Sequence, residues 1–271
     1  MAPACSTPFG FTNPGIASFD AAMLIFLLAL QSPAASKDWA RVSRLCERTL
    51  RSVCQQTVEN FRVILVCNQK PDTDFTHPAL AIVEEEFPLP QDTPGRMLDK
   101  WIKVKRGLVA AHEYGPAHVM ITDADDCVHR GLAALAAAHP DCHGWAFETG
   151  YLHDAGIPWV FRLKKFDRYC GTSGIVRLDA HEFPASMDEP TENFFILWNG
   201  HGVVGDYLSE RGRPLRPLPF IGAIYNADTG ENHTSMCLRN WRSKKMLIKK
   251  LLYTRPLTRS IRRDFGLYEL D

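Results

Sequence analysis

The sequence lacks the patterns that define several classes of protein. Its eight cysteines are scattered, with no Cys-x-x-Cys pair and no cysteine–histidine pair at zinc-finger spacing. We therefore expect mostly buried thiols in a reducing compartment. The formal net charge is zero, with 31 basic and 31 acidic residues, so no global charge favours binding to nucleic acid. No internal repeat or low-complexity tract is evident.

Long apolar runs are also missing. The run over residues 21–30 is shorter than the about 20 residues that cross a bilayer. The first basic residue is Lys37, so no basic flank precedes this run as it would in a secretory signal. We expect a cytoplasmic protein that at most touches the inner face of a membrane. The apolar fraction of 45% over 271 residues is enough for one large domain or two small ones.

The first half of the chain has the pattern of β-α-β units, which form parallel sheets with right-handed crossovers. Buried strands are expected where apolar runs are short, and helices where apolar residues recur at helical spacing. Asp38 is a suitable N-cap for the first helix, which runs to Cys54. The expected elements are strands at Met23–Leu30, Phe61–Cys67, Leu80–Val83 and 118–122, and helices after Asp38, over Met97–His112 and over Gly131–Ala138.

The second half changes character after His139. Short strands separated by Gly, Pro and Asp turns predict a mixed or antiparallel region beside the parallel half. These strands are expected at Trp145–Glu148, Trp159–Leu163, Gly174–Leu178 and Leu218–Tyr225, with a short apolar piece at Phe194–Trp198 and a helix at Val203–Glu210. We divide the chain into an irregular lead-in (1–20), a nucleotide-binding half (21–138), an acceptor-side half of the same domain (139–235) and a basic helical tail (236–271).

An acidic motif, Asp123-Ala124-Asp125-Asp126, follows the strand at 118–122 directly. Three carboxylates this close repel one another unless a cation neutralises them, and a divalent cation binds carboxylate oxygens well. In an open α/β sheet, ligands bind just outside the carboxyl ends of the strands. The motif therefore predicts a metal and a phosphate-bearing ligand at a sheet edge. A solvated acidic turn is the alternative interpretation.

The order of these elements resembles that of the GT-A class of nucleotide-sugar glycosyltransferases, especially family-2-like members. The resemblance rests on the helix tail Ser52–Phe61 (Ser-Val-Cys-Gln-Gln-Thr-Val-Glu-Asn-Phe), the strand after it, and the later strand that ends on Asp-x-Asp. It implies a GT-A fold, in which helices flank a mainly parallel sheet beside a smaller mixed acceptor region. It also implies a metal-dependent enzyme that moves a sugar from a nucleoside-diphosphate sugar to a hydroxyl of a glycan, lipid or small molecule.

The same resemblance implies a donor site. Asp123, Asp125 and Asp126 would hold Mn²⁺ or Mg²⁺ on the donor diphosphate, where a hard cation stabilises the departing charge. A late histidine, His233, would complete the metal ligands. The implied donor contacts are Gln31 and Asn68 at the nucleobase, Lys103 and Arg106 at the nucleotide or diphosphate, and Asp123. For both basic residues, a solvated helix face is the alternative interpretation.

The catalytic base departs from the family pattern. A Glu-Asp pair is expected before the helix that ends Glu210-Arg211-Gly212, but residues 199–202 read Asn-Gly-His-Gly. His201 is a candidate base because imidazole titrates near neutrality. Asp188, Glu189 and Asp206 are the other candidates.

The Gly171–Gly174 turn (Gly-Thr-Ser-Gly) resembles an acceptor-side turn of the family, or is an ordinary hairpin turn.

The tail is strongly basic. Ten Lys and Arg residues and no acidic residue lie between residues 239 and 263, with apolar residues at roughly helical spacing and Pro256 as the helix stop. A basic amphipathic helix predicts contact with an anionic membrane. Packing of the apolar stripe on the domain is the alternative interpretation.

Two other functions remain open. A haloacid-dehalogenase-like phosphatase also carries Asp-x-Asp after an apolar strand, although that family has it at the first strand of the core. A non-catalytic carbohydrate- or membrane-surface-binding protein on a GT-A-like scaffold would explain the missing Glu-Asp pair.

Overall fold

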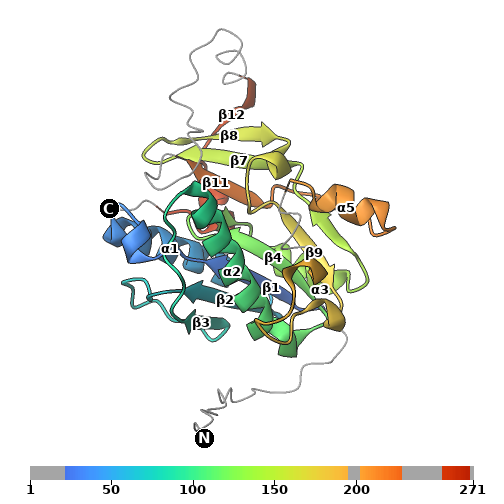
Figure 1. Cartoon of the computed structure of the whole chain (residues 1–271). Coiled ribbons are helices and arrows are strands. Elements are labelled where there is room, and N and C mark those ends of the chain that lie inside the picture. Colours follow the sequence, from blue (N-terminus) through green and yellow to red (C-terminus); the bar gives the residue numbers. More distant parts are fainter. Residues whose placement is uncertain (1–21, 195–201, 228–251, 269–271) are drawn as a thin grey trace, which may run out of the picture.

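The computed structural model describes residues 22–194, 202–227 and 252–268 (Figure 1). The chain forms an α/β protein with two sheets. The first is mixed but mostly parallel and has the strand order β10-β6-β9-β4-β1-β2-β3. Its strands are β1 (Leu24–Ala29), β2 (Phe61–Cys67), β3 (Leu80–Glu84), β4 (Ala117–Asp123), β6 (Gly144–Ala146), β9 (Gly174–Leu178) and β10 (Arg216–Pro217).

Strand β1 lies inside this sheet, between β2 and β4. It pairs in parallel with β2 and with β4, so that Ala29 lies opposite Asp123. Strands buried on both faces are expected to be apolar throughout rather than alternating. The structure confirms this for β1: Phe26 and Leu28 belong to the core on one face, and Ile25 and Leu27 to the core on the other.

The helices confirm most of the predicted first half. Helix α1 (Trp39–Cys54) begins after Asp38, whose side chain accepts a hydrogen bond from the Arg41 N–H at 3.0 Å. Helix α2 (Thr93–Ala111) begins four residues earlier than predicted, because Asp92 caps it through the Gly95 N–H at 2.7 Å. Helix α3 (Leu132–Ala138) and helix α5 (Val204–Glu210) match their predicted ranges to within one residue.

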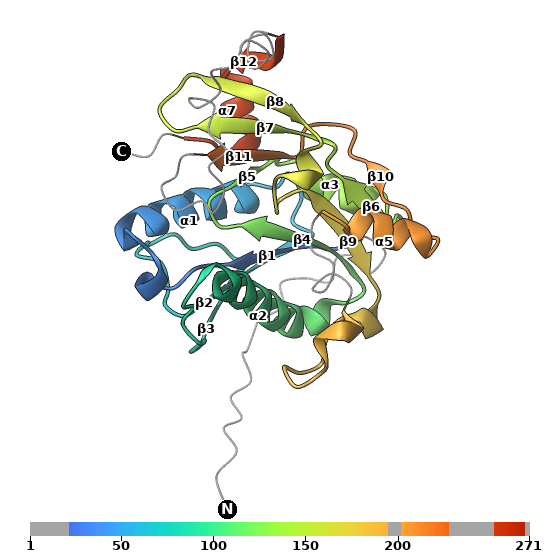
Figure 2. The same ribbon diagram turned by 45° about the horizontal axis from the view of Figure 1, so that its top comes forward.

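The chain connections reverse direction across the sheet beside β1, which makes this the topological switch point of the sheet. Helix α1 leads from β1 to β2 on one side, whereas α2 leads from β3 back across to β4 on the other side of β1. The two helices cover opposite faces of the sheet (Figure 2). In such sheets the crevice outside the carboxyl ends of the strands at the switch point is the usual ligand site. Here those strands are β1 and β4.

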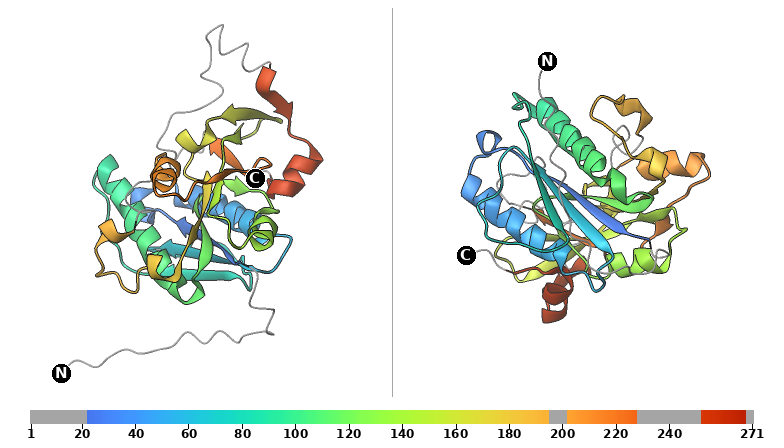
Figure 3. Two further views of the ribbon diagram at one scale, coloured as in Figure 1. Left: turned by 90° about the vertical axis from the view of Figure 1, so that its right-hand side faces the viewer. Right: turned by 90° about the horizontal axis from the view of Figure 1, so that it is seen from below.

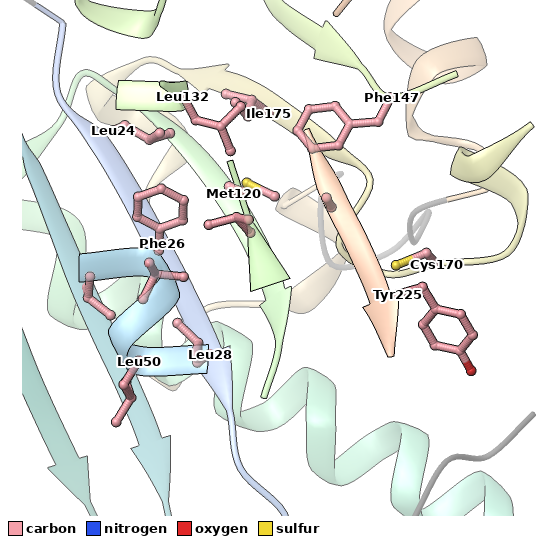
Figure 4. Close-up of a cluster of buried hydrophobic side chains, with 14 of the residues drawn as sticks. Leu24, Phe26, Leu28, Leu50, Met120, Leu132, Phe147, Cys170, Ile175 and Tyr225 are labelled. Carbon is pink, nitrogen blue, oxygen red and sulfur yellow. The ribbon is translucent and has the colours of Figure 1, made fainter. Parts of the chain in front are cut away.

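The second sheet has the order β12-β8-β7-β11-β5 and lies on the α1 side of the first. The two sheets and α1 share one core, in which Phe26, Leu50, Phe147 and Tyr225 take part (Figure 4). The strands are β5 (Cys127–Val128), β7 (Thr149–Asp154), β8 (Trp159–Lys164), β11 (Ala223–Ala227) and β12 (Thr254–Pro256). A last helix, α7 (Arg259–Phe265), packs on its outer face.

The structure corrects the predicted second half in three places. Strands β7 and β10 were not expected, and β11 begins five residues later than the predicted strand at Leu218. The end of the predicted helical tail is instead a strand, β12, followed by α7. The rest of that tail, residues 236–251, and most of the piece at 194–198 lie outside the described residues.

Two predicted properties can be compared with the described residues. Six cysteines lie there, and all are buried free thiols, as expected. Across the three described ranges, no helix is both long and apolar enough to cross a membrane.

Candidate functional site

Asp123, the last residue of β4, lies at the switch point and forms an ion pair with Lys100 of α2. Both side chains are about one quarter exposed. Burial lowers the pKa of Lys100, but the charge of Asp123 and the hydrogen bond to it outweigh this effect, so the pKa is raised overall. Lys100 is therefore a firmly charged ammonium beside a carboxylate at the carboxyl edge of the sheet.

The Gly171–Gly174 turn lies directly against Asp123. The Asp123 N–H donates to the Thr172 hydroxyl at 2.9 Å. A Cβ on Gly171 would lie 2.6 Å from an Asp123 carboxylate oxygen and 3.0 Å from the Lys100 ammonium, so a side chain there would displace this ion pair. The turn that resembles an acceptor-side element is thus in contact with the acidic motif.

We expected Asp126 to be a metal ligand, but its side chain is hydrogen-bonded inside the protein. Its side chain is fully buried, where Oδ1 accepts from the Asn226 N–H at 3.1 Å and Oδ2 from the Cys170 thiol at 3.2 Å. Burial, together with the charges of Asp125 and Asp123, raises the pKa of Asp126 well above its usual value. Asp126 therefore joins the acidic turn to β11 and to the segment before Thr172.

Asp125 is held through its backbone. Its carbonyl oxygen accepts from the Asn226 amide at 2.8 Å and lies 3.4 Å from an Arg48 guanidinium nitrogen. Asp125 itself is partly exposed, as is Asp123. The turn is thus fixed by buried groups while two of its residues remain accessible.

The predicted set of three carboxylates is reduced to two. No group of three or more His, Cys, Asp or Glu residues within the described ranges is arranged to share a metal ion. His233 lies outside those ranges. Mg²⁺ commonly binds through one or two carboxylates together with substrate phosphates. Asp123 and Asp125 fit that smaller donor set.

Gln31 and Asn68 reach the same edge of the sheet. Gln31 follows β1 by two residues, and Asn68 follows β2 directly. Both are partly buried. The Asn68 amide donates to the Phe87 carbonyl at 2.9 Å, which ties the end of β2 to the segment that leads into α2. Their predicted role at a nucleobase stays a prediction.

Lys103 and Arg106 are arranged differently from the expectation. Lys103 is fully buried, and its ammonium donates to Asp99 at 2.8 Å and to the Leu30 carbonyl at 2.9 Å. Burial lowers its pKa. Arg106 pairs with Glu85 at 2.6 Å. Lys100 is the α2 cation that pairs with an acidic side chain of the motif instead.

Sequence reasoning missed Lys100. The signal was present, because Lys100 and Lys103 are three residues apart and so lie on one side of the helix. Because α2 begins at Thr93, Lys100 lies well inside the helix, where the helical geometry sets the direction of its side chain.

A pocket opens beside the ion pair, between α2 and α5 and over β4, β9 and β6. It encloses about 720 Å³ of empty space, open solvent included. Val119, Ile121, Val176 and Leu215 line it as apolar residues. Its polar and aromatic lining comprises Lys100, Trp101, Asp167, Arg168, Ser173 and Asp206. This combination suits a ligand with both apolar and hydroxyl-bearing faces.

The candidate bases differ in relation to this pocket. Asp206 lines it and pairs with Arg168 at 3.2 Å. Asp188 and Glu189 do not line it; Asp188 is exposed, and the Glu189 carboxylate accepts from the Ala185 N–H at 2.6 Å in its own loop. His201 lies outside the described residues.

Comparisons with known proteins add little. No protein-family model matches the sequence, and no curated protein matches it. Among solved structures, the crystal structure of HddC from Yersinia pseudotuberculosis is similar at a TM-score of 0.27 and 14% identity, over 76% of this chain and 89% of that chain. Likeness at this level carries no argument about function.

Proposed function

We propose that this chain is a metal-dependent glycosyltransferase, which moves a sugar from a nucleoside-diphosphate sugar to an acceptor hydroxyl. The observation that carries the proposal is the position of Asp123. It ends β4 opposite the end of β1 at the switch point, paired with Lys100 and next to a pocket with an apolar floor and a polar rim. The resemblance in element order supports the same reading.

In this proposal, Asp123 and Asp125 hold Mn²⁺ or Mg²⁺ together with the donor diphosphate. The cation supplies Lewis-acid stabilisation of the departing nucleoside diphosphate. Lys100 adds a fixed positive charge at the same edge, and a phosphate oxygen there can share its ammonium with Asp123. Asp126 is not a ligand in this version of the site.

The sugar and the acceptor occupy the pocket between α2 and α5. Trp101 offers an aromatic wall for a sugar ring, and Asp206 is one of two carboxylates in the lining, with Asp167, that are able to accept the acceptor's proton. Arg168 forms an exposed ion pair with Asp206. His201, Asp188 and Glu189 stay as predictions for the base, with Asp206 favoured by its place in the lining.

The proposal is tested by release of nucleoside diphosphate from UDP-, GDP-, dTDP- and ADP-sugars, with Mn²⁺ or with EDTA. Transferases release the nucleotide slowly in the absence of acceptor, so turnover with one donor and only with metal is the expected result. The Asp125→Ala variant should lose about a hundredfold or more, the usual effect of removing a group that stabilises developing charge. Asp74→Ala, an exposed carboxylate on a loop after β2, is the matched control.

Two outcomes would contradict the proposal. Release of inorganic phosphate from simple phosphate esters, lost in Asp123→Asn, would favour the phosphatase. Binding of glycans without turnover of any nucleotide sugar would favour a non-catalytic carbohydrate-binding protein.

A further inference from the structure

One carboxylate oxygen of Asp123 already has a positively charged partner. The Lys100 ammonium donates to Asp123 Oδ1 in the ion pair at the carboxyl edge of the sheet. The backbone of Gly171 lies against the same carboxylate, because a Cβ built there would be 2.6 Å from Oδ2 and 3.1 Å from Oδ1. A metal ion that approaches Oδ1 of Asp123 therefore meets the Lys100 ammonium first.

Two basic side chains lie at the acidic turn. Lys100 pairs with Asp123, and a guanidinium nitrogen of the buried Arg48 is 3.4 Å from the Asp125 carbonyl oxygen. A divalent cation that binds alone is repelled by both of these charges, which offsets much of its attraction to the two carboxylates. A diphosphate that binds at the same time supplies oxygens for the metal and for the lysine. The charges of the turn therefore favour a cation that arrives together with a diphosphate.

The Lys100 side chain is able to exchange one partner for another. It lines the pocket between α2 and α5, so open space lies beside it. In the left view of Figure 3, α2 (green) and α5 (orange) lie toward the same side of the molecule. Lysine carries its charge on a flexible stem with rotatable N–H donors, so its ammonium reaches a new acceptor without movement of the helix.

The next lysine of α2 lacks this freedom. Lys103 is fully buried, and its ammonium donates to Asp99 at 2.8 Å and to the Leu30 carbonyl at 2.9 Å. Its two partners hold it away from the acidic turn. Of these two lysines, Lys100 is therefore the one whose charge can pass from a carboxylate to a ligand in the pocket.

We propose that Lys100 is an internal counter-ion, which holds Asp123 until a diphosphate binds. In the protein without ligand, its ammonium keeps Oδ1 of Asp123 from a divalent cation. When a diphosphate enters, Lys100 turns its ammonium toward a phosphate oxygen, and Asp123 becomes available to the cation that accompanies the diphosphate. This inference rests on the proposed function, because it takes Asp123 and Asp125 as the metal ligands.

The exchange makes the two ligands depend on one another. A cation alone binds weakly, and each ligand raises the affinity for the other by the same factor. Removal of the Lys100 charge should therefore change the two affinities in opposite directions, so that the cation alone binds more tightly and the diphosphate more weakly. A lysine with a merely structural role would not produce this pair of changes.

The first measurement is binding of Mn²⁺ alone to the full chain, followed by the electron paramagnetic resonance signal of the free ion. Lys100→Met should bind Mn²⁺ about tenfold more tightly than the wild type, because it removes the positive charge that is paired with Asp123. Lys100→Arg keeps that charge and should bind as weakly as the wild type. The double variant Lys100→Met/Asp125→Ala should lose the gain, which locates the bound ion at the acidic turn.

The second measurement is the melting temperature with inorganic pyrophosphate, the probe for the diphosphate, with and without Mn²⁺. In the wild type, the two together should raise the melting temperature by more than the sum of their separate shifts. In Lys100→Met, Mn²⁺ alone should already raise it, and pyrophosphate should add little because its ammonium partner is missing. Melting temperatures without ligand show that each variant folds.

The matched control is Lys70→Met. Lys70 is an exposed lysine after β2 that also pairs with a carboxylate, that of Glu84 at 3.8 Å. Its replacement should leave both measurements unchanged. Equal Mn²⁺ affinity in the wild type and in Lys100→Met would overturn the inference, as would equal tightening in Lys70→Met.

The inference and the proposed function can fail separately. Metal-dependent turnover of a nucleotide sugar, with the same Mn²⁺ affinity in the wild type and in Lys100→Met, would refute the counter-ion and support the transferase. Tighter Mn²⁺ binding in Lys100→Met, without turnover of any nucleotide sugar, would support the counter-ion and refute the transferase.

Discussion

The two sheets are built in different ways. In the parallel half, β1, α1 and β2 follow one another along the chain, and each strand is buried by helices close to it in sequence. The second sheet gathers short strands from residues 127–128, 149–164, 223–227 and 254–256. Local order therefore specifies the first region, and contacts between distant segments specify the second.

The acidic turn is where the two regions join. Asp123 ends β4 in the first sheet, and Cys127 begins β5 in the second. Asp126 and Asn226 bond the turn to β11 across 100 residues of sequence. The two residues assigned to the metal are thus supported by both regions, so the site depends on how well the sheets are joined.

The largest effect is expected in the shared core. Phe26→Ala removes a fully buried ring that meets Phe61 edge-on at 6.3 Å, and should lower the free energy of unfolding by about 3–5 kcal/mol. Because Phe161 of the second sheet belongs to the same core, Phe161→Ala should lower the same single transition. Urea denaturation followed by far-UV circular dichroism measures both. Two separate transitions, of which each variant moves only one, would show that the sheets unfold independently.

A pH effect is expected at the junction of β4 with β6 and β9. His118 is buried, with Nε2 2.9 Å from the Cys142 carbonyl oxygen, and burial lowers its pKa from 6.5 to about 4. A depressed histidine pKa means that its stabilisation is complete above pH 6.5 and is lost as the pH falls toward 4. The loss is up to about 3 kcal/mol at 1.4 kcal/mol per pH unit.

The measurement is the free energy of unfolding at several pH values, for wild type and His118→Gln. The wild type should lose stability in acid more steeply than the variant. His153 is buried and His129 partly so, and burial lowers the pKa of both, so they keep a residual slope in both proteins. Parallel pH profiles would show that His118 does not titrate as stated.

A smaller loss of stability is expected for variants of the acidic turn at residues 123–126, which joins the two sheets. Asp126→Ala leaves the buried Asn226 N–H and the Cys170 thiol without this acceptor, which typically costs about 1–3 kcal/mol. Asp125→Ala keeps the backbone bonds of the turn and should cost less. The two variants are compared by thermal melting without metal. A greater loss in Asp125→Ala would reverse the roles given to these carboxylates.

The smallest effect is confined to the parallel half. Asp38→Ala removes the N-cap of α1 and should cost about 1 kcal/mol. Asp38→Asn is the control, since asparagine caps about as well. Chemical denaturation resolves a difference of this size. A loss in Asp38→Asn equal to that in Asp38→Ala would mean that charge, and not the cap, matters at this position.

The sequence predicted the parallel half well because its signals are local. The run Phe61–Cys67 is β2 to the residue, and Asp38 caps α1 as expected. Strand β7 was missed because Tyr151, His153 and Asp154 do not look like a buried strand. His153 and Asp154 are buried, and Tyr151 partly so, because β8 and β11 pair on either side, and β11 lies about 70 residues further along the chain.

The site was predicted in part for the same reason. The apolar strand before Asp123 predicted correctly that this residue lies at the carboxyl edge of the sheet. The buried position of Asp126 could not be predicted, because it depends on hydrogen bonds from Asn226 and Cys170, which no local sequence pattern connects to Asp126. Likewise, Lys100 rather than Lys103 meets Asp123, because Lys103 is held by Asp99 and the end of β1.

The most direct test of the donor site is a thermal-shift panel of UDP, GDP, CMP, dTDP and ADP, each with and without Mn²⁺. A ligand that binds only the folded state adds about 2.7 kcal/mol at a hundredfold excess over its Kd. The account predicts a shift with one nucleoside diphosphate that requires the metal, is lost in Asp125→Ala and persists in Asp74→Ala. No shift with any nucleotide, or an equal shift in Asp125→Ala, would contradict it and leave residues 123–126 as an acidic turn that joins two sheets.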